Sequence, residues 1–260
     1  MRQHIDLART RVQVEQEAVD AKLEAFDTFV DRVADVSTEP TPSISPGITA
    51  TAGAQSHANA STDEQCRAVR TAFEETIRPH SVADIDGSEP LLATIRSEFT
   101  DSIAVALAPT TETPFSADLK RMLISEANAR RTEIDVFRRA LTREETHLET
   151  AADRLADIVT WITDADDTPL PDLGFEALKQ RHETLADHRD RCETLAQQRQ
   201  AFLQQTTNEH VEAGIEHREL VQYLYGDSPV AHPLLTTIVR LDAVCKTCQR
   251  AVRQHLVRRA

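Results

Sequence analysis

The fold is decided by residues 116–168, which read SADLKRMLISEANARRTEIDVFRRALTREETHLETAADRLADIVTWITDADDT. This stretch contains neither glycine nor proline, and its apolar residues recur mostly at steps of four or seven. They are Leu119, Leu123, Ala127, Ile134, Leu141, Leu148, Leu155 and Ile162. Such a period is typical of an amphipathic α-helix. We therefore expect one helix of about fifty residues, which is about 70 Å long at a rise of about 1.5 Å per residue.

A second long helical pattern follows a turn at residues 169–174 and ends near residues 226–229. Its sevenfold repeat positions are Leu178, Leu185, Cys192, Arg199, Thr206, Ala213 and Leu220. A compact chain of this length has a radius of gyration of only about 18 Å. Either the molecule is elongated, therefore, or one of the long helices is interrupted. We expect the break in the polar run at residues 204–210 or at Gly214.

The segment from Pro233 to the C-terminus has the most regular apolar stripe in the chain. Its members are Leu234, Ile238, Leu241, Cys245, Cys248, Val252 and Leu256. A helix of this kind buries its stripe by packing against the preceding hairpin. The predicted fold class is all-α, an elongated antiparallel coiled-coil-like bundle. Residues 111–260 form this bundle from the long helical hairpin and the C-terminal helix.

Three further segments precede the bundle. Residues 1–36 carry an apolar residue at every seventh position, which predicts an N-terminal amphipathic helix. Residues 37–62 hold three prolines, two glycines and a single charged residue, a composition typical of a disordered linker. Residues 63–110 show two short apolar stripes, each followed by a proline, and predict two short helices.

The composition is acidic and poor in lysine. The chain has 43 Asp and Glu against 29 Lys and Arg, a net charge of −14, and only four of the basic residues are lysines. Dense carboxylates keep a surface hydrated, and molar salt shortens the Debye length to about 3 Å, which screens their repulsion. We expect a protein of a high-salt cytoplasm, with an ordinary acidic protein as the alternative. The chain has six glycines, and they do not form the glycine-rich pattern of a Rossmann or P-loop phosphate-binding loop.

The charge is unevenly divided along the chain. Residues 229–260 hold six basic residues and one acidic residue, a net charge of +5, so the rest of the chain carries −19. The overall balance argues against general binding to nucleic acid or to anionic membranes. No stretch approaches the roughly 18 apolar residues of a membrane span, and the first residues are too polar for a secretory signal. With only four cysteines, these features predict a cytoplasmic protein.

Three stretches of the sequence have a distinctive composition: residues 69–76 (VRTAFEET), residues 192–200 (CETLAQQRQ), and residues 223–225 (YLY) followed by residues 232–235 (HPLL). They resemble a family of acidic helical proteins from halophilic archaea that is known only as a domain of unknown function. Together with the N-terminal helix they span most of the chain. The resemblance implies a high-salt setting and an all-helical fold, and it carries no activity.

Cys245 and Cys248 form a Cys-Lys-Thr-Cys motif, the one motif with chemical content. A CxxC pair can hold zinc at about 2.3 Å or act as a redox dithiol. Zinc needs two further ligands, for which His255, Cys192 and Cys66 are the conceivable residues. Both cysteines fall on the apolar stripe of a helix, where a free cysteine packs as a small hydrophobic residue. Core packing is the favoured interpretation, with metal binding and redox chemistry as alternatives.

The basic C-terminal helix offers Arg250, Arg253, Arg258 and Arg259 as candidate contacts to nucleic-acid phosphates. The favoured alternative is structural, because terminal cations complement the helix macrodipole and can pair with acidic helices. The histidine pairs 182/188 and 210/217 are spaced unsuitably for a shared metal ion, so we expect them on solvated polar faces.

These features predict a non-enzymatic helical scaffold or protein-interaction protein without a cofactor. Its partner would be another protein, or a second copy of itself, bound through helix faces. One alternative is a CxxC-based metal or thiol regulator. Another is a nucleic-acid-associated accessory protein that uses the basic C-terminal helix. Carboxylates such as Glu144 and Glu145 are too abundant for spacing to single out a catalytic pair.

Overall fold

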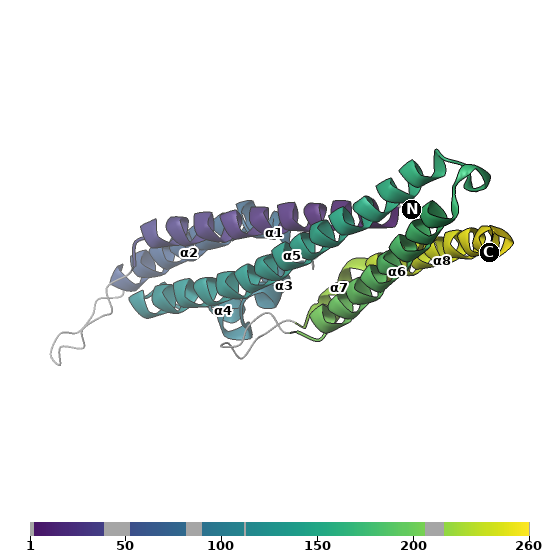
Figure 1. The fold of residues 1–260 in the computed structure, drawn as a ribbon. Helices are drawn as coiled ribbons and strands as arrows, with labels where there is room; N and C mark the ends of the chain where they lie inside the picture. The colour runs from purple at the N-terminus through teal and green to yellow at the C-terminus, as the bar shows by residue number, and fades with distance from the viewer. Residues whose placement is uncertain (1–2, 39–52, 82–89, 112, 206–215, 260) are drawn as a thin grey trace. The chain divides into compact units, whose positions relative to one another are not determined.

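The structure is a computed structural model that describes residues 3–38, 53–81, 90–111, 113–205 and 216–259, with only the backbone for 53–63. Every regular element in these ranges is a helix, which confirms the all-α fold class (Figure 1). The chain divides into two compact units. Unit 1 comprises residues 1–16 and 136–260, and unit 2 comprises residues 17–135. None of the described helices is long and apolar enough to cross a lipid bilayer.

The two longest helices each contribute residues to both units. Helix α1 spans Gln3–Asp35, and α5 spans Ala117–Asp166 over 50 residues, which confirms both predicted helices. The side chain of Ser116 accepts a hydrogen bond from the backbone N–H of Leu119 at 3.2 Å and so caps the start of α5. The absence of Gly and Pro within α5 allows it to continue without interruption until shortly before Pro169.

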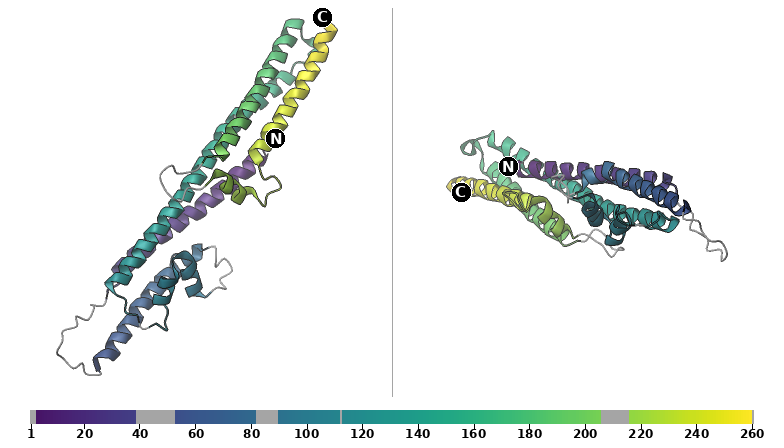
Figure 2. Two further views of the ribbon diagram at one scale, coloured as in Figure 1. Left: turned by 90° about the horizontal axis from the view of Figure 1, so that it is seen from below. Right: turned by 180° about the vertical axis from the view of Figure 1, so that it is seen from behind.

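Unit 1 is completed by α6 (Phe175–Leu203), α7 (His217–Tyr225) and α8 (Pro233–Arg259), with the 3-10 helix η3 (Leu170–Asp172) after α5. Helices α6 and α8 pack side by side, as both views in Figure 2 show. Most of the apolar stripe of α8 is buried, as are four residues of the α6 repeat, Leu178, Leu185, Cys192 and Arg199. Helix α6 ends at the start of the polar run where a break was predicted. Residues 206–215, which include His210 and Gly214, lie outside the described residues.

Unit 2 contains α2 (Gly53–Glu75), the 3-10 helix η1 (Arg78–His80), α3 (Leu91–Glu98) and α4 (Asp101–Ala106) beside its parts of α1 and α5. Its core is an aromatic cluster whose ring centroids lie 5.6–6.1 Å apart. The cluster consists of Phe26, Phe29, Phe73 and Phe99. It ties α1 and α2 to the residue that follows α3.

Two boundaries in unit 2 differ from the prediction. Residues 53–62, which were expected in the disordered linker, form the first part of α2, whereas residues 39–52 lie outside the described residues. The Ala- and Gln-rich sequence there extends an established helix at little cost, because propagation is far easier than nucleation. The second predicted short helix is split into α3 and α4, because Thr100 caps α4 by accepting a hydrogen bond from the Ile103 N–H at 3.4 Å.

Candidate functional site

Helix α8 carries the candidate residues, and its two sides differ in chemistry. Pro233 occupies the first helical position, which suits proline because that residue needs no backbone donor there. From there the apolar stripe turns inward and packs against α6, as the sequence predicted. Leu241 and Cys245 are completely buried at the middle of this inner side. The exposed residues of α8 lie on its remaining sides.

The outer side of α8 is basic. Lys246, Arg250 and Arg253 are exposed, and their i, i+4, i+7 spacing places them along one line on the helix. Val239 and Val257, which are 64% and 72% exposed, continue this line at either end. We call these five residues the α8 stripe. Within the part of the chain that the structure describes, none of the three cations forms an ion pair, so the expected pairing with acidic helices is not seen there.

Arg258 and Arg259 lie off the α8 stripe. Both are exposed in the last turn of α8, where cations complement the negative end of the helix macrodipole. Arg259 also donates a hydrogen bond to the backbone oxygen of Pro171, in the turn that follows α5. The four candidate arginines therefore divide into Arg250 and Arg253 on the stripe and a terminal pair. Sequence reasoning did not single out Lys246, although a helical projection of residues 239–257 places it between the two arginines and the first valine.

The CxxC cysteines lie on the inner side of α8. Cys245 is completely buried, and Cys248 is half-buried beside a small cavity of about 170 Å³. Burial raises the pKa of the Cys245 thiol to about 12 and also raises the pKa of the Cys248 thiol. Thiols with raised pKa values stay protonated at neutral pH and are poor nucleophiles. All four cysteines are free, and the described residues contain no group of three side chains suited to a metal ion.

A buried ion pair connects three helices of unit 1. Arg199 of α6 donates two hydrogen bonds to Glu144 of α5, at 2.7 and 2.9 Å, and the two residues are 2% and 0% exposed. Tyr225 of α7 donates its hydroxyl to the same carboxylate at 3.1 Å. Paired and hydrogen-bonded in this way, the buried charges are compensated. The sequence contains one signal for this ion pair, because Arg199 occupies a core position of the sevenfold repeat. It did not identify Glu144 as the partner.

Histidines lie close to this ion pair and elsewhere in unit 1. The rings of His147 and His217 both contact Phe202, each with centroids 4.2 Å apart. Burial lowers the pKa of His147 to about 4 and also lowers the pKa of His217. His188 is also buried and packs edge-on against Trp161. The prediction of solvated faces is therefore wrong for His188 and His217, because each lies on the side of its helix that packs against aromatic side chains of its neighbours.

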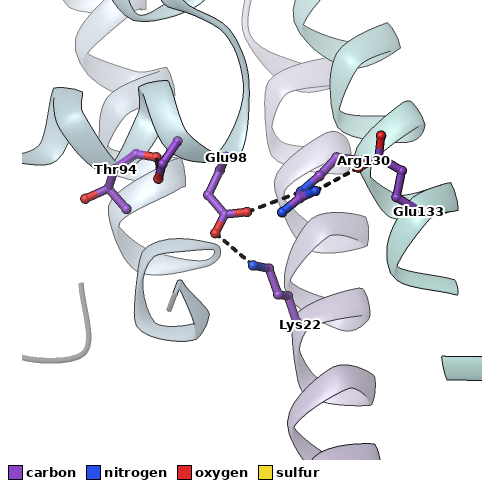
Figure 3. A network of polar contacts seen from close by, with 6 residues as sticks. Lys22, Thr94, Glu98, Arg130 and Glu133 are labelled. Carbon is purple, nitrogen blue, oxygen red and sulfur yellow. Dashed lines mark hydrogen bonds and ion pairs between the residues drawn. The ribbon is translucent and has the colours of Figure 1, made fainter. Parts of the chain in front are cut away.

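Unit 2 has a polar network of its own (Figure 3). Lys22 of α1 donates to Glu98 of α3 at 2.7 Å, and Arg130 of α5 lies 3.6 Å from the second oxygen of that carboxylate. Arg130 also pairs with Glu133 one turn along α5, at 2.7 Å. The Glu98 side chain is 5% exposed, whereas those of Arg130 and Glu133 are 39% and 57% exposed. The network orients three helices and runs from the interior of the unit to solvent.

The fold and these clusters define an all-helical protein with buried ionic contacts and an exposed basic stripe on α8. The chain belongs to the family described as a domain of unknown function, DUF7260, whose model matches residues 3–249. No curated protein and no solved structure matches it. The predicted membership of an uncharacterised family is therefore confirmed. The origin of that family in halophilic archaea stays a prediction.

Proposed function

We propose that this protein is a non-enzymatic scaffold or interaction protein that binds an acidic protein surface through the α8 stripe. The observation that supports this is that Lys246, Arg250 and Arg253 are exposed and form no ion pair within the described residues. A chain with a net charge of −14 has many carboxylates with which to pair its cations. Three neighbouring cations instead face solvent between two exposed valines on a helix whose inner side is largely buried. Arginines and apolar groups together are typical of protein interfaces.

The proposed setting is a high-salt cytoplasm. The acidic balance, the four lysines and the four free cysteines are consistent with it, because reducing compartments keep thiols unpaired. The test is a thermal melt in low salt and in molar KCl. We expect a clearly higher melting temperature in molar KCl, where the carboxylate repulsion is screened. Equal melting temperatures would contradict the setting and leave an ordinary acidic protein.

Two other functions compete with this proposal. The α8 stripe has the charge to contact nucleic-acid phosphates, but the acidic remainder of the chain would repel them. A metal or thiol regulator would depend on Cys245 and Cys248, whose burial and raised pKa values disfavour thiolate chemistry. The zinc content of protein purified without a chelator, compared with that of a Cys245→Ser/Cys248→Ser variant, tests the metal hypothesis directly.

The experiment for the interaction surface uses a labelled helical peptide with glutamates at i, i+4 and i+7, followed by fluorescence anisotropy. We expect the full chain to bind it, and a Lys246→Gln/Arg250→Gln/Arg253→Gln variant to bind at least tenfold more weakly. The control is Arg11→Gln/Arg121→Gln/Arg218→Gln, which removes three exposed cations elsewhere, two of which pair with a carboxylate of their own helix. The same peptide with glutamines, and a duplex DNA of equal length, complete the comparison. Equal binding by the stripe variant and the wild type would refute the proposal.

A further inference from the structure

Helix α6 has an acidic outer side that is the counterpart of the α8 stripe. Glu183, Asp187 and Asp190 are exposed and follow one another at i, i+4, i+7. We call these three residues the α6 stripe. In the portion of the chain that the structure describes, none of these carboxylates forms an ion pair. The buried residues of α6, such as Leu185 and Cys192, lie on the opposite side of the helix.

The two stripes match in spacing as well as in charge. The cations at positions 246, 250 and 253 and the carboxylates at positions 183, 187 and 190 use the same steps of four and three residues. On an α-helix each set therefore spans about 10.5 Å. Two helices laid together with these stripes facing can form three charge pairs side by side. A network of several charges in fixed register is more effective than isolated exposed pairs.

The stripes cannot satisfy each other within one chain. Helices α6 and α8 pack against each other through their apolar sides, and this directs both stripes away from the shared contact. The α6 stripe can therefore meet an α8 stripe only on another molecule. A second copy of this chain presents such a set of carboxylates on α6, in the required spacing.

We infer that the α8 stripe of one copy docks on the α6 stripe of a second copy of this chain. This inference rests on the proposed function and names its partner. Because both stripes belong to unit 1, each copy carries both sides of this contact. Val239 and Val257 lie at the ends of the contact and lose water as it forms.

The test is a charge exchange between two variants of the full chain. The first variant, Lys246→Glu/Arg250→Glu/Arg253→Glu, has two acidic stripes. The second variant, Glu183→Lys/Asp187→Lys/Asp190→Lys, has two basic stripes. Sedimentation velocity is measured at one fixed salt concentration at which circular dichroism shows that all chains are equally helical. All six positions are exposed, so we expect both variants to fold.

The wild type is expected to self-associate, and each variant alone is expected to do so at least tenfold more weakly. An equimolar mixture should recover association to within a few-fold of the wild type, because each stripe then meets one of opposite charge. A third chain, Arg11→Glu/Arg121→Glu/Arg218→Glu, changes the net charge as much as the first variant and should associate like the wild type. This control separates the stripe from the net charge.

Three outcomes would overturn the inference. They are a monomeric wild type, variants that associate as well as the wild type, and a mixture that fails to recover. If the wild type is monomeric but the acidic peptide still binds through the α8 stripe, only the second copy is excluded as partner, and the proposed function survives. If duplex DNA alone binds through the stripe, both proposals fail in favour of a nucleic-acid contact.

Discussion

The buried carboxylates of the two units differ in how closely they are paired and in how exposed their cations are. In unit 1, Glu144 and Arg199 are 0% and 2% exposed, and two hydrogen bonds join them. In unit 2, the Glu98 side chain is 5% exposed, and its second cation, Arg130, is 39% exposed and 3.6 Å away. Part of the Arg130 guanidinium is solvated, although its Nε and the facing Glu98 Oε2 are buried without a hydrogen bond, whereas Arg199 is almost entirely removed from water. The ion pair of unit 1 therefore depends more strongly on close pairing to offset its desolvation.

The largest effect should come from breaking the buried ion pair of unit 1. An Arg199→Met substitution leaves the Glu144 carboxylate buried with only Tyr225 as a donor. We expect a loss of about 3–5 kcal/mol in the free energy of unfolding, as is typical when one partner of a buried pair is removed. Urea unfolding followed by circular dichroism at constant salt measures it.

The control for this prediction removes the whole cluster. In the variant Glu144→Leu/Arg199→Met/Tyr225→Phe no charge or hydroxyl is left unpaired. We expect this chain to be more stable than Arg199→Met by at least about 2 kcal/mol, because apolar replacements of a buried ion pair are often neutral. If Arg199→Met unfolds at the same urea concentration as the wild type, the buried ion pair of unit 1 does not contribute to stability in the way that distinguishes it from the network of unit 2.

A smaller loss is expected at the equivalent position of unit 2. Lys22→Met removes the closest donor to Glu98 but leaves Arg130 within reach. We expect a loss of about 1–3 kcal/mol, toward the lower end of this range. Lys22→Arg should retain most of the stability, since it keeps a cation at the same place. A loss as large as that of Arg199→Met would show that water does not assist the network of unit 2.

Acidic pH should destabilise unit 1 through its histidines. Burial lowers the pKa of His147 from 6.5 to about 4, so the unfolded chain binds a proton more readily than the folded chain. The stability is then fully present above about pH 6.5 and is lost as the pH falls from 6.5 to about 4. Because His147 is only half-buried, solvent screening reduces the expected loss to about 1–2 kcal/mol. His188 and His217, whose pKa values are also lowered, act in the same direction.

A His147→Phe variant isolates this contribution. It keeps the ring that stacks on Phe202 and removes the group that titrates. The difference between wild type and variant is to be measured by urea unfolding at a series of pH values. Carboxylate titration affects both chains equally and cancels in that difference. Parallel stability curves between pH 6.5 and 4 would show that His147 does not contribute.

The smallest effect is expected for an exposed pair of unit 2, which serves as the baseline. Arg32 and Glu75 lie 2.5 Å apart, but their side chains are 46% and 56% exposed. Arg32→Gln should change the free energy of unfolding by no more than about 0.5 kcal/mol, because the side chains are already solvated. A thermal melt is sufficient to detect a larger change. Such a change would mean that exposure is a poor guide to the strength of these pairs.

Much of the fold followed from apolar periodicity. The helices of residues 3–35, 117–166 and 233–259 have the predicted type and nearly the predicted ends. The pattern did not show that residues 53–62 extend α2, since a polar composition is compatible with a helix that begins elsewhere. It also placed one helix where Thr100 separates two. Local hydrogen bonds decide such boundaries, and periodicity does not detect them.

The candidate site was predictable in part. Arg250 and Arg253 could be named from the charge of the last helix, whereas their common line with Lys246 required a helical projection. The partners of Arg199 could not be predicted, because Glu144 is 55 positions away along the chain and one of 43 acidic residues. Burial of His188 and His217 likewise depends on which aromatic side chains the neighbouring helices present.

The sequence by itself determined that this protein is all-α, that it contains long uninterrupted helices, and that its charge is unevenly distributed along the chain. These properties depend on neighbours within a few turns, which periodicity and propensity record directly. Only the tertiary structure decided which charges are buried together and which remain in solvent. Contacts of that kind join residues distant in the sequence, and their energy depends on how far each group is removed from water.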